Sequence, residues 1–279
     1  MNESKIPKLL QEIPDKPKQL YMIGEYPDQE NNIFLTIVGS RKFTNYGKLA
    51  CEKIIAGLAG YPFVIVSGLA LGIDTIAHRA ALENDLTTVA VPGSGLDQSV
   101  LYPSSNKKLA REILDAGGCL LSELEPTTKA APWTFPQRNR IMAGLSHAVL
   151  VIEAENKSGT RITARLATEY NRDVFAIPGS IFSPMSVGCN ELIREGATPI
   201  TSAADILNYF HMLDENPVQQ QMIALEPDEQ SVMDVLHEPL SRNALADKLD
   251  MPVMKINILL SSMEIKGLIS ENLGKIYKK

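Results

Sequence analysis

Apolar residues in the first three quarters of the chain come in short unbroken runs, most of them followed by an amphipathic stretch. The run from Ile33 to Val38, for example, precedes a helical stripe of apolar residues from Tyr46 to Leu58. Strands that are apolar throughout and alternate with helices favour a parallel sheet with helices on both faces. The sequence therefore predicts an α/β fold, doubly wound and Rossmann-like, with a mostly parallel sheet. The predicted strands lie within residues 33–38, 61–68, 87–95, 118–124, 147–154 and 173–180, and the predicted helices within residues 46–58, 73–84, 106–117 and 160–171.

The pattern changes beyond residue 212. Residues 215–230 are polar and acidic and contain two prolines, which is typical of a linker. Three short helical stretches follow, and the last of them, Pro252 to Lys266, precedes two short strands. Three helices and a terminal β-ribbon predict a small winged-helix domain with Pro252–Lys266 as its recognition-type helix. The predicted divisions are an N-terminal extension (1–32), the Rossmann-like domain (33–212), a linker (213–228) and the winged-helix domain (229–279).

Composition narrows the class of protein. The chain has 279 residues, 44% hydrophobic and 22% charged, which is enough material for a sizeable core. No apolar run approaches the roughly 20 residues that span a bilayer, and the N-terminus has no apolar signal region. The three cysteines lie far apart and match no zinc or redox spacing. We therefore expect a cytoplasmic protein without a membrane partner, a metal site or a cofactor.

The net charge of −6 argues mildly against a nucleic-acid partner, but it is unevenly distributed. Residues 129–172 contain seven Lys or Arg against three acidic residues, a local balance of +4. Residues 251–279 contain five lysines against two glutamates, a balance of +3. Over residues 229–279, however, seven basic residues face seven acidic ones, so the sequence leaves open whether this domain binds duplex DNA or protein.

Gly and Ser recur at the carboxyl ends of the predicted strands, which read VGSR, VSGLALGID, VPGSGLD, EAENKSGT and IPGS. Parallel sheets bind ligands at this edge, where glycine lets backbone N–H groups approach a phosphate and the next helix favours negative charge. None of these turns matches the G-x-G-x-x-G or Walker pattern, and any one of them could be structural. Several such turns on one edge of the sheet predict an anion-binding pocket.

Aromatic and basic residues alternate in PWTFPQRNRIMAGL, residues 132–145. The only tryptophan, Trp133, and Phe135 stand just before Arg138 and Arg140. Aromatic rings can stack on unpaired bases while arginines neutralise phosphates. The same pattern fits a hydrophobic plug before a solvated helix, and the residues alone leave both interpretations open.

Two acidic residues and a histidine could be read as an acid–base site. Asp74 and His78 stand four apart on one predicted helix, and Asp97 lies in GLDQSVLYP. No Ser or Cys beside them makes a nucleophile–base arrangement. We interpret Asp74 as a hydrogen-bonding or capping residue, His78 as a packed or half-exposed helical residue and Asp97 as a turn residue.

Seven long motifs follow one another between residues 6 and 202. They read VGSR, SGLALGIDTIAHRAAL, TVAVPGSGLDQSVLYPSSNKKL, GGCLLSE, FPQRNRIMAGLSHAVLVIEA, SGTRITARLATEYNRDVFAIPGS and SVGCNELIREGA. In content and order they resemble the DNA-processing protein A (DprA, or Smf) family. The resemblance implies a cytoplasmic bacterial protein that binds single-stranded DNA and loads the recombinase RecA onto it in natural transformation. It also implies an extended Rossmann core that forms a homodimer, often with a C-terminal winged helix.

The resemblance assigns roles to individual residues. Arg41 matches the arginine of the family's Gly-Ser-Arg turn, which faces the DNA, so its guanidinium would pair with a strand phosphate. The family often has an N-terminal helical domain, for which the residues before the first predicted strand are too few. Some members have a lysine after the Tyr-Pro of the third motif; this chain has Ser104 there, and Lys107 is the candidate replacement. The expected DNA-binding residues are Gly39, Ser40, Arg41, Ser67, Gly68, Lys107, Arg138, Asn139, Arg140 and Lys157, and the expected dimer interface contains Asn190, Leu192, Ile193 and Pro199.

An enzyme is the alternative. Related Rossmann-like proteins cleave nucleoside monophosphates with the signature P-G-G-x-G-T-x-x-E, and this chain has ENKSGTRIT at the comparable strand end. Gly159 and Thr160 match the signature, but Thr163 stands at the glutamate position, which leaves such a site without its acid–base group. We therefore predict a binding protein with no catalytic residue, and a phosphoribohydrolase-like enzyme as the second possibility.

Overall fold

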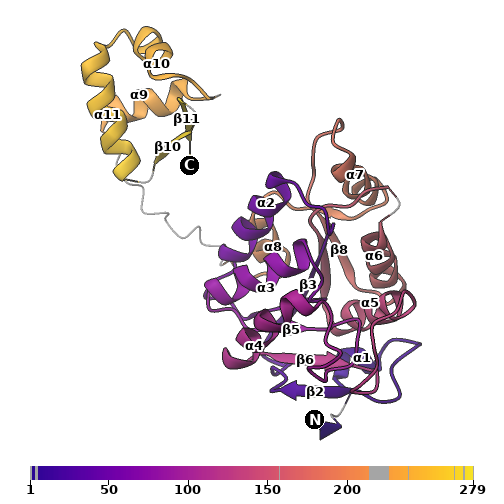
Figure 1. The fold of residues 1–279 in the computed structure, drawn as a ribbon. Helices are drawn as coiled ribbons and strands as arrows, with labels where there is room; N and C mark the ends of the chain where they lie inside the picture. The colour runs from indigo at the N-terminus through magenta and orange to yellow at the C-terminus, as the bar shows by residue number, and fades with distance from the viewer. Residues whose placement is uncertain are drawn as a thin grey trace. The chain divides into compact units, whose positions relative to one another are not determined.

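The computed structural model divides the chain into two compact units, Met1–Leu213 and Asp214–Lys279 (Figure 1). The structure describes residues 2–3, 6–156, 158–213, 226–237, 239–266, 268–272 and 274–278. Most of the predicted linker and Lys157 lie outside the described residues.

A sheet in the order β1-β2-β6-β5-β4-β3-β7-β8-β9 runs through the first unit. Every neighbouring pair from β6 to β9 is parallel, whereas β2 is antiparallel to β6 and β1 to β2. The strand order reverses at β3, which has β4 on one side and β7 on the other. The predicted doubly wound, mostly parallel sheet is confirmed, and its switch point lies between β3 and β7. The strands are β1 (Asn2–Glu3), β2 (Tyr21–Gly24), β3 (Ile33–Val38), β4 (Phe63–Ser67), β5 (Thr88–Ala90), β6 (Cys119–Ser122), β7 (Ala148–Val151), β8 (Asp173–Ala176) and β9 (Thr198–Pro199).

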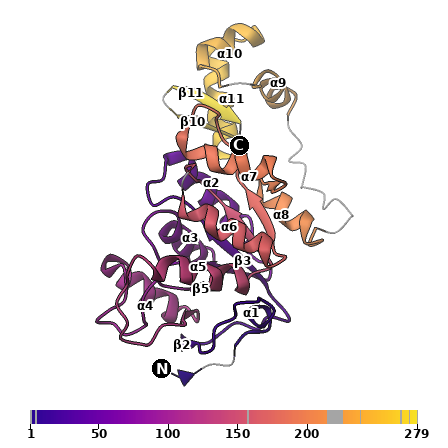
Figure 2. The ribbon, with the colours of Figure 1, turned by 90° about the vertical axis from the view of Figure 1, so that its right-hand side faces the viewer.

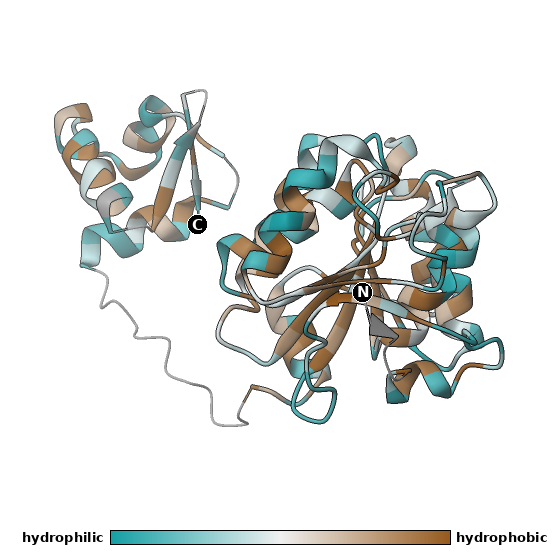
Figure 3. Ribbon diagram, turned by 60° about the horizontal axis from the view of Figure 1, so that its bottom comes forward, coloured by the Kyte–Doolittle hydropathy of each residue, from teal (hydrophilic) through white to brown (hydrophobic). Residues whose placement is uncertain are grey.

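Helices cover both faces of this sheet. Alternate residues of β3 point to opposite sides, so Phe34 and Val38 pack with α5, α6 and α7, whereas Leu35 and Ile37 pack with α2, α3 and α8. Figure 2 shows α5 and α6 in front of the strands, and Figure 3 shows apolar strands between helices whose outer surfaces are polar. The helices of this unit are α1 (Lys8–Gln11), α2 (Asn45–Ala56), α3 (Ile73–Glu83), α4 (Lys107–Asp115), α5 (Thr134–Leu145), α6 (Gly159–Glu169), α7 (Val187–Arg194) and α8 (Ala203–Tyr209).

Two elements differ from the sequence-based expectation. Strand β2 lies in the predicted N-terminal extension and pairs with β6, although its four residues show no clear alternation. Helix α5 begins at Thr134 and is not among the helices predicted from the apolar pattern. Pro136 lies in the first turn of α5, where a backbone N–H has no partner within the helix, so the proline is tolerated there.

The second unit contains three helices and a hairpin within its described residues. Strands β10 (Ile269–Asn272) and β11 (Lys275–Lys278) are antiparallel. Its own core includes Val232, Leu245, Ile256 and Ile276, all at most 1% exposed. This helical and hairpin layout agrees with the predicted small C-terminal domain. The helices are α9 (Pro227–Val235), α10 (Arg242–Leu249) and α11 (Val253–Ile265).

In the part of the chain that the structure describes, no helix combines the length and the apolar character needed to cross a bilayer.

Candidate functional site

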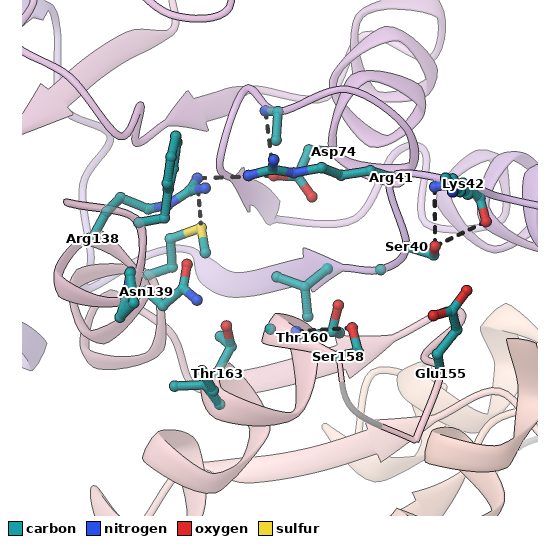
Figure 4. Close-up of a pocket in the computed structure, with 18 residues that line it drawn as sticks. Ser40, Arg41, Lys42, Asp74, Arg138, Asn139, Glu155, Ser158, Thr160 and Thr163 are labelled. Atoms are coloured by element: carbon teal, nitrogen blue, oxygen red, sulfur yellow. Dashed lines mark hydrogen bonds and ion pairs between the residues drawn. The ribbon is translucent and has the colours of Figure 1, made fainter. Parts of the chain in front are cut away.

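A pocket opens at the carboxyl ends of β3, β4 and β7, beside the switch point of the sheet (Figure 4). The turn after β3 and helices α3 and α5 form one side of it, and the N-terminus of α6 forms the other. Figure 4 shows Arg41, Asp74 and Arg138 across the pocket from Ser158, Thr160 and Thr163. The polar or charged side chains of the lining are Ser40, Arg41, Lys42, Asp74, Arg138, Asn139, Glu155, Ser158, Thr160 and Thr163.

The turn after β3 presents Arg41. Ser40 closes the turn, because its Oγ donates to the carbonyl of Lys42 at 2.8 Å and accepts from the N–H of Lys42 at 3.0 Å. Gly39 is required by close packing, since a Cβ there would lie 2.6 Å from the side chain of Ile73. Arg41 is exposed, and its guanidinium carbon lies 5.0 Å from the centre of the Phe135 ring. A cation over an aromatic face is attracted by the ring, so Phe135 helps to orient Arg41 toward the pocket.

Glu153 anchors the chain just after this turn. The residue is 2% exposed, and its carboxylate accepts from the backbone N–H of Thr44 at 2.9 Å and from the Thr44 hydroxyl at 2.5 Å. Thr44 in turn is the N-cap of α2 and accepts from Gly47. A Cβ at Gly47 would lie 2.3 Å from the Glu153 carboxylate, so only glycine leaves room for it. Glu153, two residues after β7, therefore fixes the start of α2 directly after the Arg41 turn.

Arg138 and Asp74 form a buried pair at the floor of the pocket. Their side chains are 7% and 9% exposed, and Arg138 Nη1 lies 3.8 Å from Asp74 Oδ2. Arg138 Nη1 also donates to the Val91 carbonyl at 2.8 Å, while Asp74 accepts from the N–H of Gly68 at 3.1 Å. Burial raises the pKa of Asp74 above its usual range, and the neighbouring guanidinium opposes that rise. The guanidinium of Arg138 is therefore buried and held by contacts with Asp74 and the Val91 carbonyl.

The N-terminus of α6 faces Arg41 across the pocket. Ser158 is the N-cap, and its Oγ accepts from the N–H of Thr160 at 3.2 Å. Gly159 is exposed, and a Cβ there would meet nothing within 4 Å. Backbone N–H groups in the first turn of an 11-residue helix favour an anion in front of them. The pocket therefore combines an exposed guanidinium, a helix N-terminus and the Phe135 ring.

The structure brings together five of the expected DNA-binding residues, namely Gly39, Ser40, Arg41, Arg138 and Asn139. Gly68 lines a smaller hollow beside them, which it shares with Tyr102 and Phe135. The turn residues Lys42, Ser158 and Thr160 also line the pocket but were not singled out as contacts. The serine and threonine in KSGT, at the start of a predicted helix, are the signal that could have identified Ser158 and Thr160.

The remaining expected contacts lie elsewhere. Ser67 is fully buried, and its Oγ donates to the Ile37 carbonyl at 2.7 Å inside the sheet. Lys107 stands at the start of α4 and is not among the residues that line the pocket. Arg140 points away from the pocket, because it forms an ion pair with Glu123 and lies 3.8 Å from Asp15 in the N-terminal segment. Lys157 lies outside the described residues.

The expected interface residues have mixed environments. Asn190 holds a loop, since its amide donates to the Gly179 carbonyl at 3.0 Å and accepts from the Gly179 N–H at 3.2 Å. Leu192 is 8% exposed and belongs to the core, against which Ile193 packs half-buried. Pro199 is exposed on the edge strand β9.

The structural interpretation of the acid–base candidates is confirmed. Asp74 bonds backbone N–H groups, and Asp97 accepts from the N–H and hydroxyl of Ser99 in a turn. His78 is fully buried, with Nδ1 2.8 Å from the Thr88 hydroxyl, and burial lowers its pKa to about 3. Within the described residues, no group of three or more His, Cys, Asp or Glu side chains could hold a metal ion.

Comparison with known proteins decides the family. Residues 1–211 match the family model described as "DNA recombination-mediator protein A". The chain belongs to this family. The resemblance drawn from the motifs is therefore confirmed.

Curated relatives and solved structures agree with this membership. DprA of Streptococcus pneumoniae is 47% identical over 201 residues, covering 72% of this chain and 70% of the relative. Protein Smf of Escherichia coli is 37% identical over 270 residues, covering 92% of this chain and 70% of the relative. The solved S. pneumoniae DprA has a TM-score of 0.67 at 45% identity and covers 73% of this chain and 70% of that one. DprA of Helicobacter pylori, whose structure is described as showing a single-stranded DNA binding mode, has a TM-score of 0.66 at 34% identity, covering 75% and 95%.

Proposed function

We propose that the pocket beside the switch point binds single-stranded DNA. The observation that carries this proposal is the exposed Arg41 guanidinium beside the Phe135 ring, opposite the N-terminus of α6. An arginine and helix N–H groups bind phosphates, and an aromatic ring stacks on any unpaired base. The described binding mode of the H. pylori relative supports the same ligand.

The contacts divide between the strand backbone and the bases. Arg41 and the first turn of α6 hold phosphates, which are the same in every sequence. Phe135 offers a face to a base, and Asn139 offers an amide to a base edge or sugar. Binding is therefore tolerant of sequence and selective for unpaired strands, because a base inside a duplex cannot reach the ring.

Within this family, we propose that the protein is a recombination mediator that loads RecA onto incoming single strands in natural transformation. It acts as a homodimer in the cytoplasm, with the half-buried Ile193 and the exposed edge residue Pro199 as candidate contacts. Membership in a recombination-mediator family and the single-stranded DNA binding mode described for the H. pylori relative support the proposal.

We propose binding without catalysis. Thr163 occupies the position where related hydrolases have a glutamate, and it is 1% exposed at the pocket wall. The buried carboxylate in the lining, Asp74, is bonded to backbone N–H groups and paired with Arg138. The observed contacts of Asp74 are therefore structural ones, with backbone N–H groups and with a guanidinium.

Mobility-shift titrations with an oligothymidine and with a duplex of equal length test the binding proposal. We expect the single strand to bind more tightly and to lose affinity steeply with salt, because bound phosphates release counterions. Equal affinity for both ligands would contradict the proposal. Incubation with the four nucleoside monophosphates tests the alternative, since release of free base would show hydrolysis.

A further inference from the structure

An exposed apolar patch lies outside the pocket. It consists of side chains from two segments, the start of α2 and the loop between β8 and α7. Phe182 is 90% exposed and Ile181 81%, which are unusual values for such large apolar side chains. We call this set the α2–loop patch; its members are Phe43, Tyr46, Leu49, Ile181 and Phe182, whose exposed fractions run from 42% to 90%.

One hydrogen bond joins the two segments, and others fix the loop itself. The hydroxyl of Tyr46 donates to the Pro178 carbonyl at 2.6 Å, three residues before Ile181. The Ser180 hydroxyl accepts from the N–H of Phe182 at 3.2 Å. The far end of the loop is also fixed, because Ala154 at the end of β7 donates its N–H to the carbonyl of Met185 at 2.9 Å. Phe182 is therefore presented on an anchored loop beside α2.

The patch continues from the pocket. Lys42 lines the pocket, and the next residue, Phe43, is the first member of the patch. Tyr46, Leu49 and Lys53 follow at helical spacing along one exposed stripe of α2. A ligand that extends out of the pocket past Lys42 would meet this stripe.

The charged residues in the two segments of the patch favour binding of an anion. Residues 39–53 contain Arg41, Lys42, Lys48 and Lys53 against one acidic residue, Glu52, which pairs with Lys48 at 3.7 Å. Residues 178–190 contain no charged residue. The next carboxylate, Glu191, pairs with Arg161 at 2.5 Å. Exposed aromatic rings with Arg41, Lys42 and Lys53 on the adjoining turn and helix match a flexible strand with phosphates and flat bases.

We propose that single-stranded DNA leaving the pocket continues over the α2–loop patch and stacks a base on Phe182. This inference rests on the proposed function and adds a second contact region to it. Tyr46 and Phe43 offer further aromatic faces along the way, and Lys42 and Lys53 lie where strand phosphates would pass. The patch therefore binds only strands longer than the pocket itself holds.

The test measures fluorescence anisotropy of labelled oligothymidines of about 5 and about 20 nucleotides, lengths that bracket the usual site size for a single-strand protein. Because loss of one stacked base weakens binding roughly fivefold or more, Phe182→Ala should weaken the long strand by that factor and leave the short strand unchanged. Phe182→Tyr keeps the ring and should bind both strands as the wild type does. Arg79→Ala removes an exposed side chain that belongs neither to the pocket lining nor to the α2–loop patch, so it is the control and should change either affinity less than twofold.

Three further measurements separate the possible failures. If Phe182→Ala binds the long strand normally while Arg41→Ala loses both strands, the patch does not bind DNA and the proposed function stands. If the wild type prefers neither strand over duplex, the proposed function itself fails. Light scattering decides a third outcome: conversion of a wild-type dimer into a monomer by Phe182→Ala would overturn the inference and make the patch a contact between two copies of the chain.

Discussion

Replacing Arg41 with alanine should weaken binding of single-stranded DNA without affecting the fold. Arg41 is exposed, and its guanidinium carbon lies over the ring of Phe135, 5.0 Å from the ring centre. A hydrogen bond to a charged partner contributes about 1.5–3 kcal/mol, and exposure favours the lower end of that range. We therefore expect a loss of about 1.5–2 kcal/mol, or roughly 10- to 30-fold in Kd at low salt.

The salt dependence identifies the contact as a phosphate. Each phosphate neutralised on a single strand contributes about −0.7 to the slope of log K against log[salt], so Arg41→Ala should make that slope shallower by about 0.7. Arg41→Lys keeps the charge but loses the planar, bidentate geometry and the stacking on Phe135. It should restore most of the slope but only part of the affinity. Because the contact carries no sequence information, oligomers of different sequence should lose affinity equally.

Anisotropy titrations at several salt concentrations give both quantities. Arg79→Ala is the matched control, because Arg79 is also an exposed arginine but is not among the residues that line the pocket. Thermal denaturation checks that both variants are folded. A well-folded Arg41→Ala protein with wild-type affinity and wild-type salt slope would refute the assignment of Arg41 as a phosphate contact.

Three more results are expected. Ile193→Glu should convert a dimer into a monomer in light scattering at micromolar concentration, because it places two unpaired charges at a two-fold contact; a monomeric wild type would exclude that interface. His78 has a pKa of about 3 in the folded protein against an ordinary value of 6.5, so the unfolding free energy should fall as the pH drops from 6.5 toward 3, by up to roughly 4 kcal/mol. His78→Asn should reduce this pH dependence of the unfolding free energy in denaturant titrations at pH 7 and pH 4. An unchanged dependence on pH would contradict the lowered pKa of His78 as its cause. The fragment 226–279 should bind duplex DNA weakly at most even at low salt, because Lys255 and Lys266 pair with acidic residues of α9 at 2.6 and 2.7 Å; tight duplex binding would contradict this expectation.

The apolar runs of the sequence were enough to predict the central sheet. Strand β3, for example, occupies Ile33–Val38 as expected, because a strand buried on both faces is apolar at nearly every position; the exception, Thr36, is buried with its hydroxyl bonded to the Met142 carbonyl. Strand β2 could not be predicted in the same way, since three of its four residues are not fully buried and its place in the sheet depends on pairing with the distant strand β6. Local patterns therefore predict the buried central strands better than short, partly buried ones.

The candidate site was predictable only where its conformation depends on residues adjacent in the sequence. Gly39, Ser40 and Arg41 form a turn whose conformation depends on adjacent residues, so the sequence indicates it directly. Arg138 and Arg140 stand two positions apart on α5 and therefore point about 200° apart around the helix. Arg138 faces Asp74, whereas Arg140 faces Glu123. Which of the two faces the pocket depends on the packing of α5 against distant segments, which sequence spacing cannot show.

The two arginines of the pocket have different physical roles. Asp74 lies buried below the proposed phosphate site, where an unpaired carboxylate would repel an anionic strand through a medium of low dielectric. Arg138 neutralises that carboxylate from inside, and its approach requires glycine at position 68, where a Cβ would lie 1.3 Å from Nη1. Because Asp74 also accepts from the N–H groups of Gly68 and Ala70, the pair holds the turn after β4 in place beside the Arg41 turn. The buried arginine thus stabilises the floor of the pocket, and the exposed Arg41 is the arginine that we propose as the phosphate contact.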